Sequence, residues 1–146
     1  MLEKDEVQMM FTQGINCAMQ VFGAIAPRLG LERETAYRIA AAYGGGMGQG
    51  GPCGAVCGAL MALGLACGND QPGDMNARKA FFAKQTEFKQ EFLQRFPGLS
   101  CIEVLGCDLR QAEGKRKMLE ENLLETVCTT AVCAAVEIVE EILELD

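Results

Sequence analysis

Apolar residues recur along this chain three or four positions apart, which is the spacing of one face of an α-helix. Phe81, Phe88 and Phe92 follow it in one long amphipathic stretch, which Pro97 and Gly98 end. Alternating patterns typical of strands are almost absent. The pattern and its breakers predict helices over residues 7–13, 16–26, 32–43, 52–65, 77–96, 100–106, 113–124 and 127–145. The expected fold class is all-α, with a single compact multi-helix domain over residues 1–146.

A glycine-rich loop precedes the predicted helix at residues 52–65. Its letters, GMGQGG at residues 46–51, match the G-x-G-x-x-G pattern of dinucleotide-binding folds. The loop follows a helix rather than a strand, however, and the acidic residue expected about 20 positions later in a second strand is missing. We therefore interpret the loop as a close approach of the backbone to Cys53, or as an opening for a small substrate or electron partner.

The composition is that of an acidic globular protein. The 146 residues are 49% hydrophobic, with a mean hydropathy of +0.09, a net charge of −7 and a pI near 4.7. Phosphates would repel such a chain, so nucleic acid is excluded as a partner. The N-terminus lacks the pattern of a secretory signal, and the most apolar stretch, residues 55–66, is too short for a membrane span. A cytoplasmic location is the resulting expectation.

Eight cysteines and no histidine make sulfur the main source of chemistry in this chain. Cytosolic thiols are kept reduced, so this number of cysteines favours metal binding or redox catalysis over a disulfide scaffold. Three of them directly follow a residue that favours the start of a helix: Asn16–Cys17, Pro52–Cys53 and Ser100–Cys101. A thiol there faces unpaired backbone N–H groups and the positive end of the helix dipole. Both effects favour the thiolate, which is the form that binds metal and attacks disulfides.

A fourth cysteine, Cys128, begins the last predicted helix, and Thr126 just before it is a candidate N-cap. The remaining four cysteines have no such placement. Cys57 lies one helical turn after Cys53 and shares its face, which makes Cys57 the candidate for an auxiliary role. The other three are interpreted as packing residues: Cys67, Cys107 and Cys133.

Four blocks of sequence, taken in order, resemble a known family. The blocks are GINCAMQVF, PCGAVCGAL, SCIEVLG and VCTTAVCAAV, and the resemblance extends over most of the chain, from about Phe11 to Leu143. They are similar to the C_GCAxxG_C_C family of redox-active proteins, whose name records four spaced cysteines. The second block carries the C-G-A-x-x-G motif at residues 53–58. By this resemblance the four family cysteines correspond to Cys17, Cys53, Cys101 and Cys128.

The resemblance implies redox activity, and a similar module in the split-Soret cytochromes accompanies an iron–sulfur site. This chain has no C-x-x-C-H motif, so covalently bound haem is not expected. Without histidine, a metal held by Cys17, Cys53, Cys101 and Cys128 has sulfur ligands only, which suits zinc or an iron–sulfur centre. The ligands are not paired as C-x-x-C, and this disfavours structural zinc.

We favour electron transfer through an iron–sulfur cluster of the [2Fe–2S] type, held where the four cysteines converge. The first alternative is a metal-free thiol–disulfide oxidoreductase or redox sensor, with Cys53 and Cys57 as the catalytic residues. The second is a structural helical module whose cysteines only pack. Whether the protein is an enzyme is left open. The expected partner is a redox protein or a small redox substrate, and a homodimer is compatible with the sequence.

Overall fold

The helical spacing of the sequence is realised as α-helices joined by short turns. The computed structural model describes residues 2–145, so the two end positions of the predicted domain, residues 1 and 146, lie outside the described residues. The helices are α1 (Lys4–Thr12), α2 (Cys17–Ile25), α3 (Arg33–Ala40), α4 (Gly54–Cys67), α5 (Met75–Leu93), α6 (Cys101–Leu105), α7 (Ala112–Glu120) and α8 (Thr129–Leu143). Residues 2–145 contain no β-strand, which confirms the all-α prediction.

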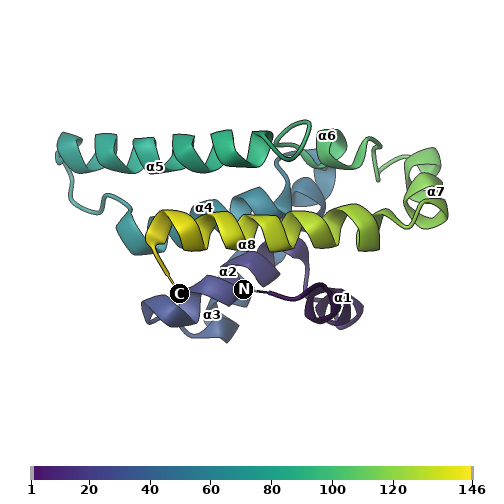
Figure 1. The fold of residues 1–146 in the computed structure, drawn as a ribbon, viewed down its shortest axis with the longest axis horizontal. Coiled ribbons are helices and arrows are strands. Elements are labelled where there is room, and N and C mark those ends of the chain that lie inside the picture. The colour runs from purple at the N-terminus through teal and green to yellow at the C-terminus, as the bar shows by residue number, and fades with distance from the viewer. Residues whose placement is uncertain (1, 146) are drawn as a thin grey trace.

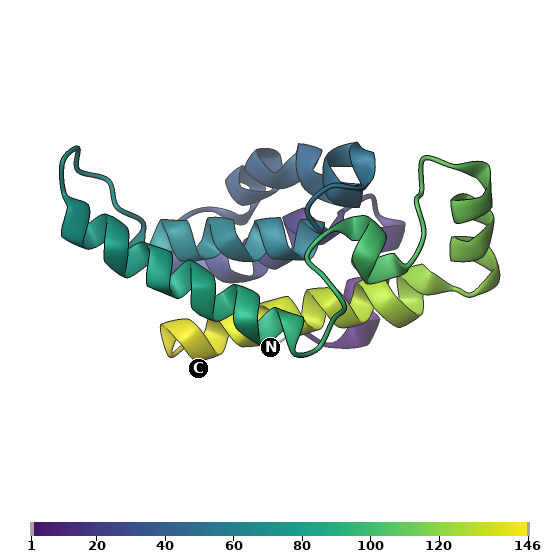
Figure 2. The same ribbon diagram turned by 90° about the horizontal axis from the view of Figure 1, so that it is seen from above.

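Helices α2, α4 and α8 pack against one another and form the centre of the molecule. Helix α5 lies along α4 and α8, while α3 covers α2 and α1 contacts α8 (Figure 1). Seen from above, α7 stands at one end, beyond the central helices (Figure 2). Phe88 and Phe92 of the predicted apolar face are buried here on α5, and Val132 and Val136 are buried on α8. Within the described part of the chain, no helix combines the length and apolar composition needed to cross a bilayer.

Two of the predicted helix starts carry the expected caps. The Oδ1 of Asn16 accepts a hydrogen bond from the N–H of Met19 at 3.0 Å and so begins α2. The Oγ of Ser100 accepts from the N–H of Glu103 at 3.0 Å, and the Glu103 carboxylate accepts from the N–H of Ser100 at 3.3 Å. This reciprocal pair is a capping box, and it fixes the first turn of α6.

The predicted helix start at Cys128 is wrong. A π-helical segment, Leu124–Cys128, runs directly into α8, so Cys128 already lies inside a helix. The helix restarts early because Asn122 adopts a left-handed φ of 53°, which turns the chain sharply after α7. Thr126 does not act as a cap, since its Oγ1 donates to the carbonyl of Asn122 at 3.0 Å. At the other predicted start, α4 begins at Gly54 and Cys53 occupies the N-cap position.

Asn16 holds two elements together, and its replacement tests both contacts. Besides capping α2, it donates from Nδ2 to the carbonyl of Ala41, 2.9 Å away. Asn16→Ala is expected to lower the free energy of unfolding by about 1–2 kcal/mol, since the cap is lost. Asn16→Asp keeps the cap acceptor but cannot donate to Ala41, so it should cost less. Urea denaturation under reducing conditions measures both, and an Asn16→Ala variant as stable as wild type would contradict the assignment.

Candidate redox site

Four cysteines from different parts of the chain line one cavity. The cavity has a volume of about 230 Å³, and its wall includes Cys17, Cys53, Cys101 and Cys128. These are the four cysteines singled out from the sequence, and they meet where α2, α4 and α6 begin and the π-helical segment ends. The rest of the wall is mainly apolar, and none of the described residues that line it carries a charged side chain. Charges placed in such surroundings interact more strongly than they do in water.

A short antiparallel backbone bridge holds two of these cysteines side by side. The N–H of Cys53 donates to the carbonyl of Leu99 at 2.7 Å, and the N–H of Cys101 donates to the carbonyl of Gly51 at 2.7 Å. These bonds join the start of α4 to the start of α6, although the two cysteines are far apart in the sequence. The bridge therefore fixes the relative position of Cys53 and Cys101 in the metal-free protein.

Glycines allow the backbone to approach the cysteines closely. A Cβ atom on Gly54 would overlap with the Sγ of Cys17, and one on Gly46 would lie 2.8 Å from the Cβ of Cys101. Gly46 also adopts a left-handed φ of 65°, which favours glycine over any other residue. The glycine-rich loop is thus a close approach of backbone to the cysteine cavity, one of the two interpretations offered by the sequence.

The sulfur of Cys17 lies among backbone N–H groups from three segments. Hydrogen bonding from the backbone of Gly45, Ala18 and Gly54 acts to lower the pKa of this thiol. The donors belong to the glycine-rich loop, the start of α2 and the start of α4. At Cys53, the backbone N–H groups of the first turn of α4 have the same effect. Such inward-facing N–H groups stabilise a negative charge on sulfur.

Burial nevertheless outweighs these N–H groups, and the expectation of lowered thiol pKa values is wrong for the metal-free chain. Desolvation, with repulsion from the Cys17 charge next, raises the pKa of Cys53 to about 12. The same two causes raise the pKa of Cys101 to about 11. The pKa of Cys128 and that of Cys17 are also raised, above all by burial. Without a cation, all four side chains are therefore thiols at neutral pH.

These raised pKa values make the metal-free protein sensitive to alkali. A folded thiol with a pKa above its ordinary value of 9.0 stabilises the fold below that value and loses this contribution as the pH rises towards about 12. Urea denaturation of the reduced, metal-free protein should therefore show stability falling from about pH 9 upwards. Cys53→Ala should make the decline shallower. An equally steep decline in that variant would contradict the assignment.

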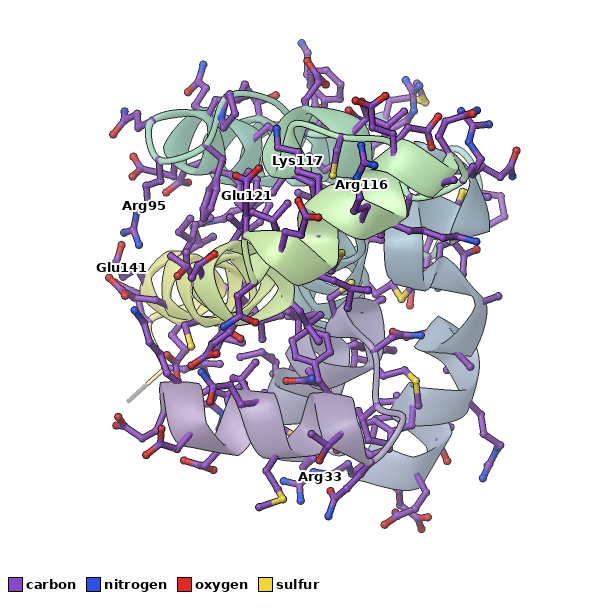
Figure 3. The ribbon with its side chains drawn as sticks, turned by 90° about the vertical axis from the view of Figure 1, so that its right-hand side faces the viewer. Arg33, Arg95, Arg116, Lys117, Glu121 and Glu141 are labelled. Atoms are coloured by element: carbon purple, nitrogen blue, oxygen red, sulfur yellow. The ribbon has the colours of Figure 1, made fainter. Side chains whose placement is uncertain are left out.

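Cys107 is a residue whose location the sequence did not reveal. It packs in a small apolar cluster with Cys101 and Cys128, and its charge contributes to the raised pKa of both after burial and the charge of Cys17. The signal in the sequence that could have located Cys107 was Gly106, the residue before it. Gly106 adopts a left-handed φ of 74°, and there α6 ends and the chain turns back. Lys117 on α7 donates from Nζ to the carbonyl of Gly106 at 3.3 Å and so fastens α7 over this end (Figure 3).

The remaining cysteines lie outside the cavity wall. The Sγ of Cys57 points back towards the carbonyl of Pro52, 3.9 Å away. Cys67 is exposed near the end of α4, where its Sγ lies 3.2 Å from the carbonyl of Leu63. Cys133 lies on α8 beside a separate hollow near the N-terminus. Cys57 is thus near the cavity but not part of it, and its auxiliary role stays a prediction.

The cavity sulfurs are not arranged as ligands of one metal ion. Among residues 2–145, no group of three or more cysteine, aspartate or glutamate side chains is close enough to hold a single ion. The chemistry of the wall is nevertheless that of a sulfur-ligand site, with four thiols, N–H donors and no competing charge. The predicted metal-ligand role of the four cysteines therefore stays a prediction.

Comparison with known proteins finds a protein family whose pattern includes the cysteines of the cavity. The model of a family described as "Putative redox-active protein (C_GCAxxG_C_C)" matches residues 15–142, a span that includes all four cavity cysteines. No curated protein and no solved structure matches the chain. The match extends over most of the sequence and contains the motif at residues 53–58. The chain therefore belongs to this C_GCAxxG_C_C family.

Proposed function

We propose that this protein transfers electrons through an iron–sulfur cluster of the [2Fe–2S] type held by Cys17, Cys53, Cys101 and Cys128. The observation that carries the proposal is the shared cavity, where four thiols from four segments meet in an apolar wall. Four cysteines are the usual ligand set of such a cluster. When bound, the cluster would supply reversible one-electron chemistry.

The raised thiol pKa values support a metal-bound site over free thiol chemistry. Burial and the charge of Cys17 raise the pKa of Cys53 and of Cys101 well above neutrality, so neither is an effective nucleophile by itself. Bound metal removes this obstacle because a coordinating thiol is deprotonated outright. The four thiols thus suit metal coordination better than disulfide exchange.

The surrounding backbone supports an anionic centre. N–H groups from Gly45 and Gly54 favour negative charge at the Cys17 sulfur, and hydrogen bonds of this kind tune the potential of cysteine-ligated clusters. The apolar wall carries no charged side chain that would compete with the sulfurs for a metal. The protein residues would therefore supply the ligands, the compensating N–H dipoles and an apolar surrounding.

A cluster makes less strict demands on the positions of its four sulfurs than one zinc ion does. Zinc binds cysteine sulfur at about 2.3 Å, which brings four tetrahedral ligands within about 4 Å of one another. A cluster distributes its cysteine ligands over two or more irons and accommodates wider separations. That no described group is arranged for a single ion is consistent with the wider set.

Reconstitution under anaerobic conditions tests the proposal. The reduced full-length chain is incubated with ferrous iron and sulfide, or with zinc alone, and then separated from unbound ions. We expect a coloured product with nearly equal amounts of iron and labile sulfide. Cys101→Ser should lose most of it, and Cys67→Ser, which changes an exposed thiol, should retain it. A colourless protein that takes up only zinc, or nothing, would refute the cluster.

A further inference from the structure

A second hollow adjoins the cysteine cavity and differs from it in chemistry. This recess has a volume of about 220 Å³ and lies between α1 and the segment that leads into α8. Helix α1 contributes Gln8 and Thr12, and the opposite side contributes Asn122 and Glu125. Figure 3 looks onto this end of the molecule, with α1 below and α7 above it. The recess therefore carries polar side chains beside apolar ones, whereas the wall of the cavity is almost wholly apolar.

Two apolar side chains separate the recess from the sulfurs. Phe11 and Leu124 line both hollows, so they form the wall between them. Phe11 is half-buried and Leu124 is 39% exposed, so neither is locked into the core. A molecule in the recess is therefore separated from the cysteine cavity by one layer of side chains.

Leu124 and a cavity cysteine also belong to one structural unit. Leu124 begins the π-helical segment that Cys128 ends. The carbonyl of Leu124 accepts a hydrogen bond from the Oγ1 of Thr129, a fully buried residue that lines the recess. Single π-helical turns of this kind occur frequently at functional sites.

The polar groups of the recess restrict what it can bind. Gln8 offers an uncharged amide, and Thr12 offers a hydroxyl oxygen whose own proton is donated to the carbonyl of Met9. Glu125 is the one charged side chain among the described residues that line the recess. The Glu125 carboxylate accepts a hydrogen bond from the amide of Asn122, which orients it. A single carboxylate with no opposing cation disfavours anions and admits neutral or cationic molecules.

We propose that the recess binds a small neutral or cationic hydrogen-bonding molecule, the redox substrate of the neighbouring cysteine site, and that Phe11 and Leu124 govern its passage to the sulfurs. This inference rests on the proposed function for its redox role. The recess as an entrance, however, can be tested without any cluster. The substrate is thereby assigned to a chemical class: small, hydrogen-bonding and not anionic.

Alkylation of the metal-free, reduced full-length chain tests the route. Three small reagents of different charge serve as probes: iodoacetamide, iodoacetate and 2-bromoethylammonium. Rates at Cys128 and Cys17 are read by peptide mass spectrometry, relative to exposed Cys67 in the same sample and to the urea-unfolded chain. We expect the neutral and cationic reagents to be favoured over iodoacetate. Glu125→Gln should reduce this preference by about twofold to fivefold, the range expected of one exposed charge.

Substitutions in the shared wall locate the entrance. Phe11→Ala should accelerate alkylation at Cys128 by about fivefold or more, since it removes most of one barrier side chain, and Phe11→Trp should slow it. Unchanged alkylation of the half-buried Cys133 shows that a variant is still folded. Met118→Ala is the matched control, because Met118 lines the cavity from α7 and not the recess.

Two results would overturn the inference. One is acceleration by Met118→Ala with no response to either Phe11 substitution, which places the entrance under α7. The other is a charge preference that Glu125→Gln leaves unchanged. Because these rates are measured without iron, a failure here leaves the cluster proposal standing. A failed reconstitution likewise leaves the entrance standing.

Discussion

Replacing Cys17 with serine is expected to remove iron and labile sulfide from the anaerobically purified protein, with metal affinity reduced by more than about tenfold. Cys17 interacts electrostatically with each of the other three cavity thiols. After burial, its charge is the largest cause of the raised pKa at Cys53, Cys101 and Cys128. Backbone N–H groups also converge on its sulfur. Loss of this proposed ligand therefore removes the sulfur on which these N–H groups act.

Cys133→Ser is the matched control for this experiment. Cys133 is partly exposed like Cys17, but it lies on α8 away from the cavity wall. Iron and sulfide contents of both variants are measured at equal protein concentration. Far-ultraviolet circular dichroism establishes that each variant is folded. If Cys17→Ser kept the iron content of wild type, Cys17 would not be a ligand and the proposed set of four would be wrong.

Replacing Gly54 with alanine is expected to have the second large effect, on both stability and cluster binding. A Cβ atom at this position would overlap with the Sγ of Cys17 and lie 3.0 Å from the carbonyl oxygen of Tyr43. The backbone on that side cannot yield easily, so we expect a loss of about 3 kcal/mol in the free energy of unfolding. The sulfur of Cys17 would have to move, and iron binding should fall with it.

Gly64→Ala provides a close comparison on the same helix. Gly64 lies within α4, and a Cβ atom there would meet only the ring of Phe81, at 3.8 Å. Alanine at this position should therefore stabilise the protein by about 0.5–1 kcal/mol, as it usually does inside a helix. Urea denaturation gives both values. Equal effects of the two substitutions would show that Gly54 is not required by the approach of Cys17.

Local chemistry accounts for the parts of the site that could be predicted from the sequence. Asn16 and Ser100 are strong capping residues, and their side chains act within three positions of themselves, so the starts of α2 and α6 follow directly. Cys17 and Cys101 directly follow these capping residues, so each is the first residue of its helix. The convergence with Cys53 and Cys128 followed from the family resemblance rather than from any spacing rule.

Tertiary packing explains the expectations that failed. Helix-start N–H groups do act on Cys17 and Cys53, but the desolvation that outweighs them arises from residues distant in the sequence. The prediction that Cys107 packs agrees with its place in the small apolar cluster, but its neighbours in the sequence give no sign that Cys101 and Cys128 belong to the same cluster. The start of α8 was misplaced because Asn122 turns the chain in a conformation uncommon for a residue other than glycine.

Native mass spectrometry of the full-length protein, purified without oxygen, tests the central claim most directly. The account predicts a mass greater than that of the chain by two irons and two sulfides, less the protons lost by the thiols of Cys17, Cys53, Cys101 and Cys128. The added mass should disappear on treatment with an iron chelator. A protein that carries a single zinc, or that has the mass of the bare reduced chain or of its disulfide form, would contradict the account.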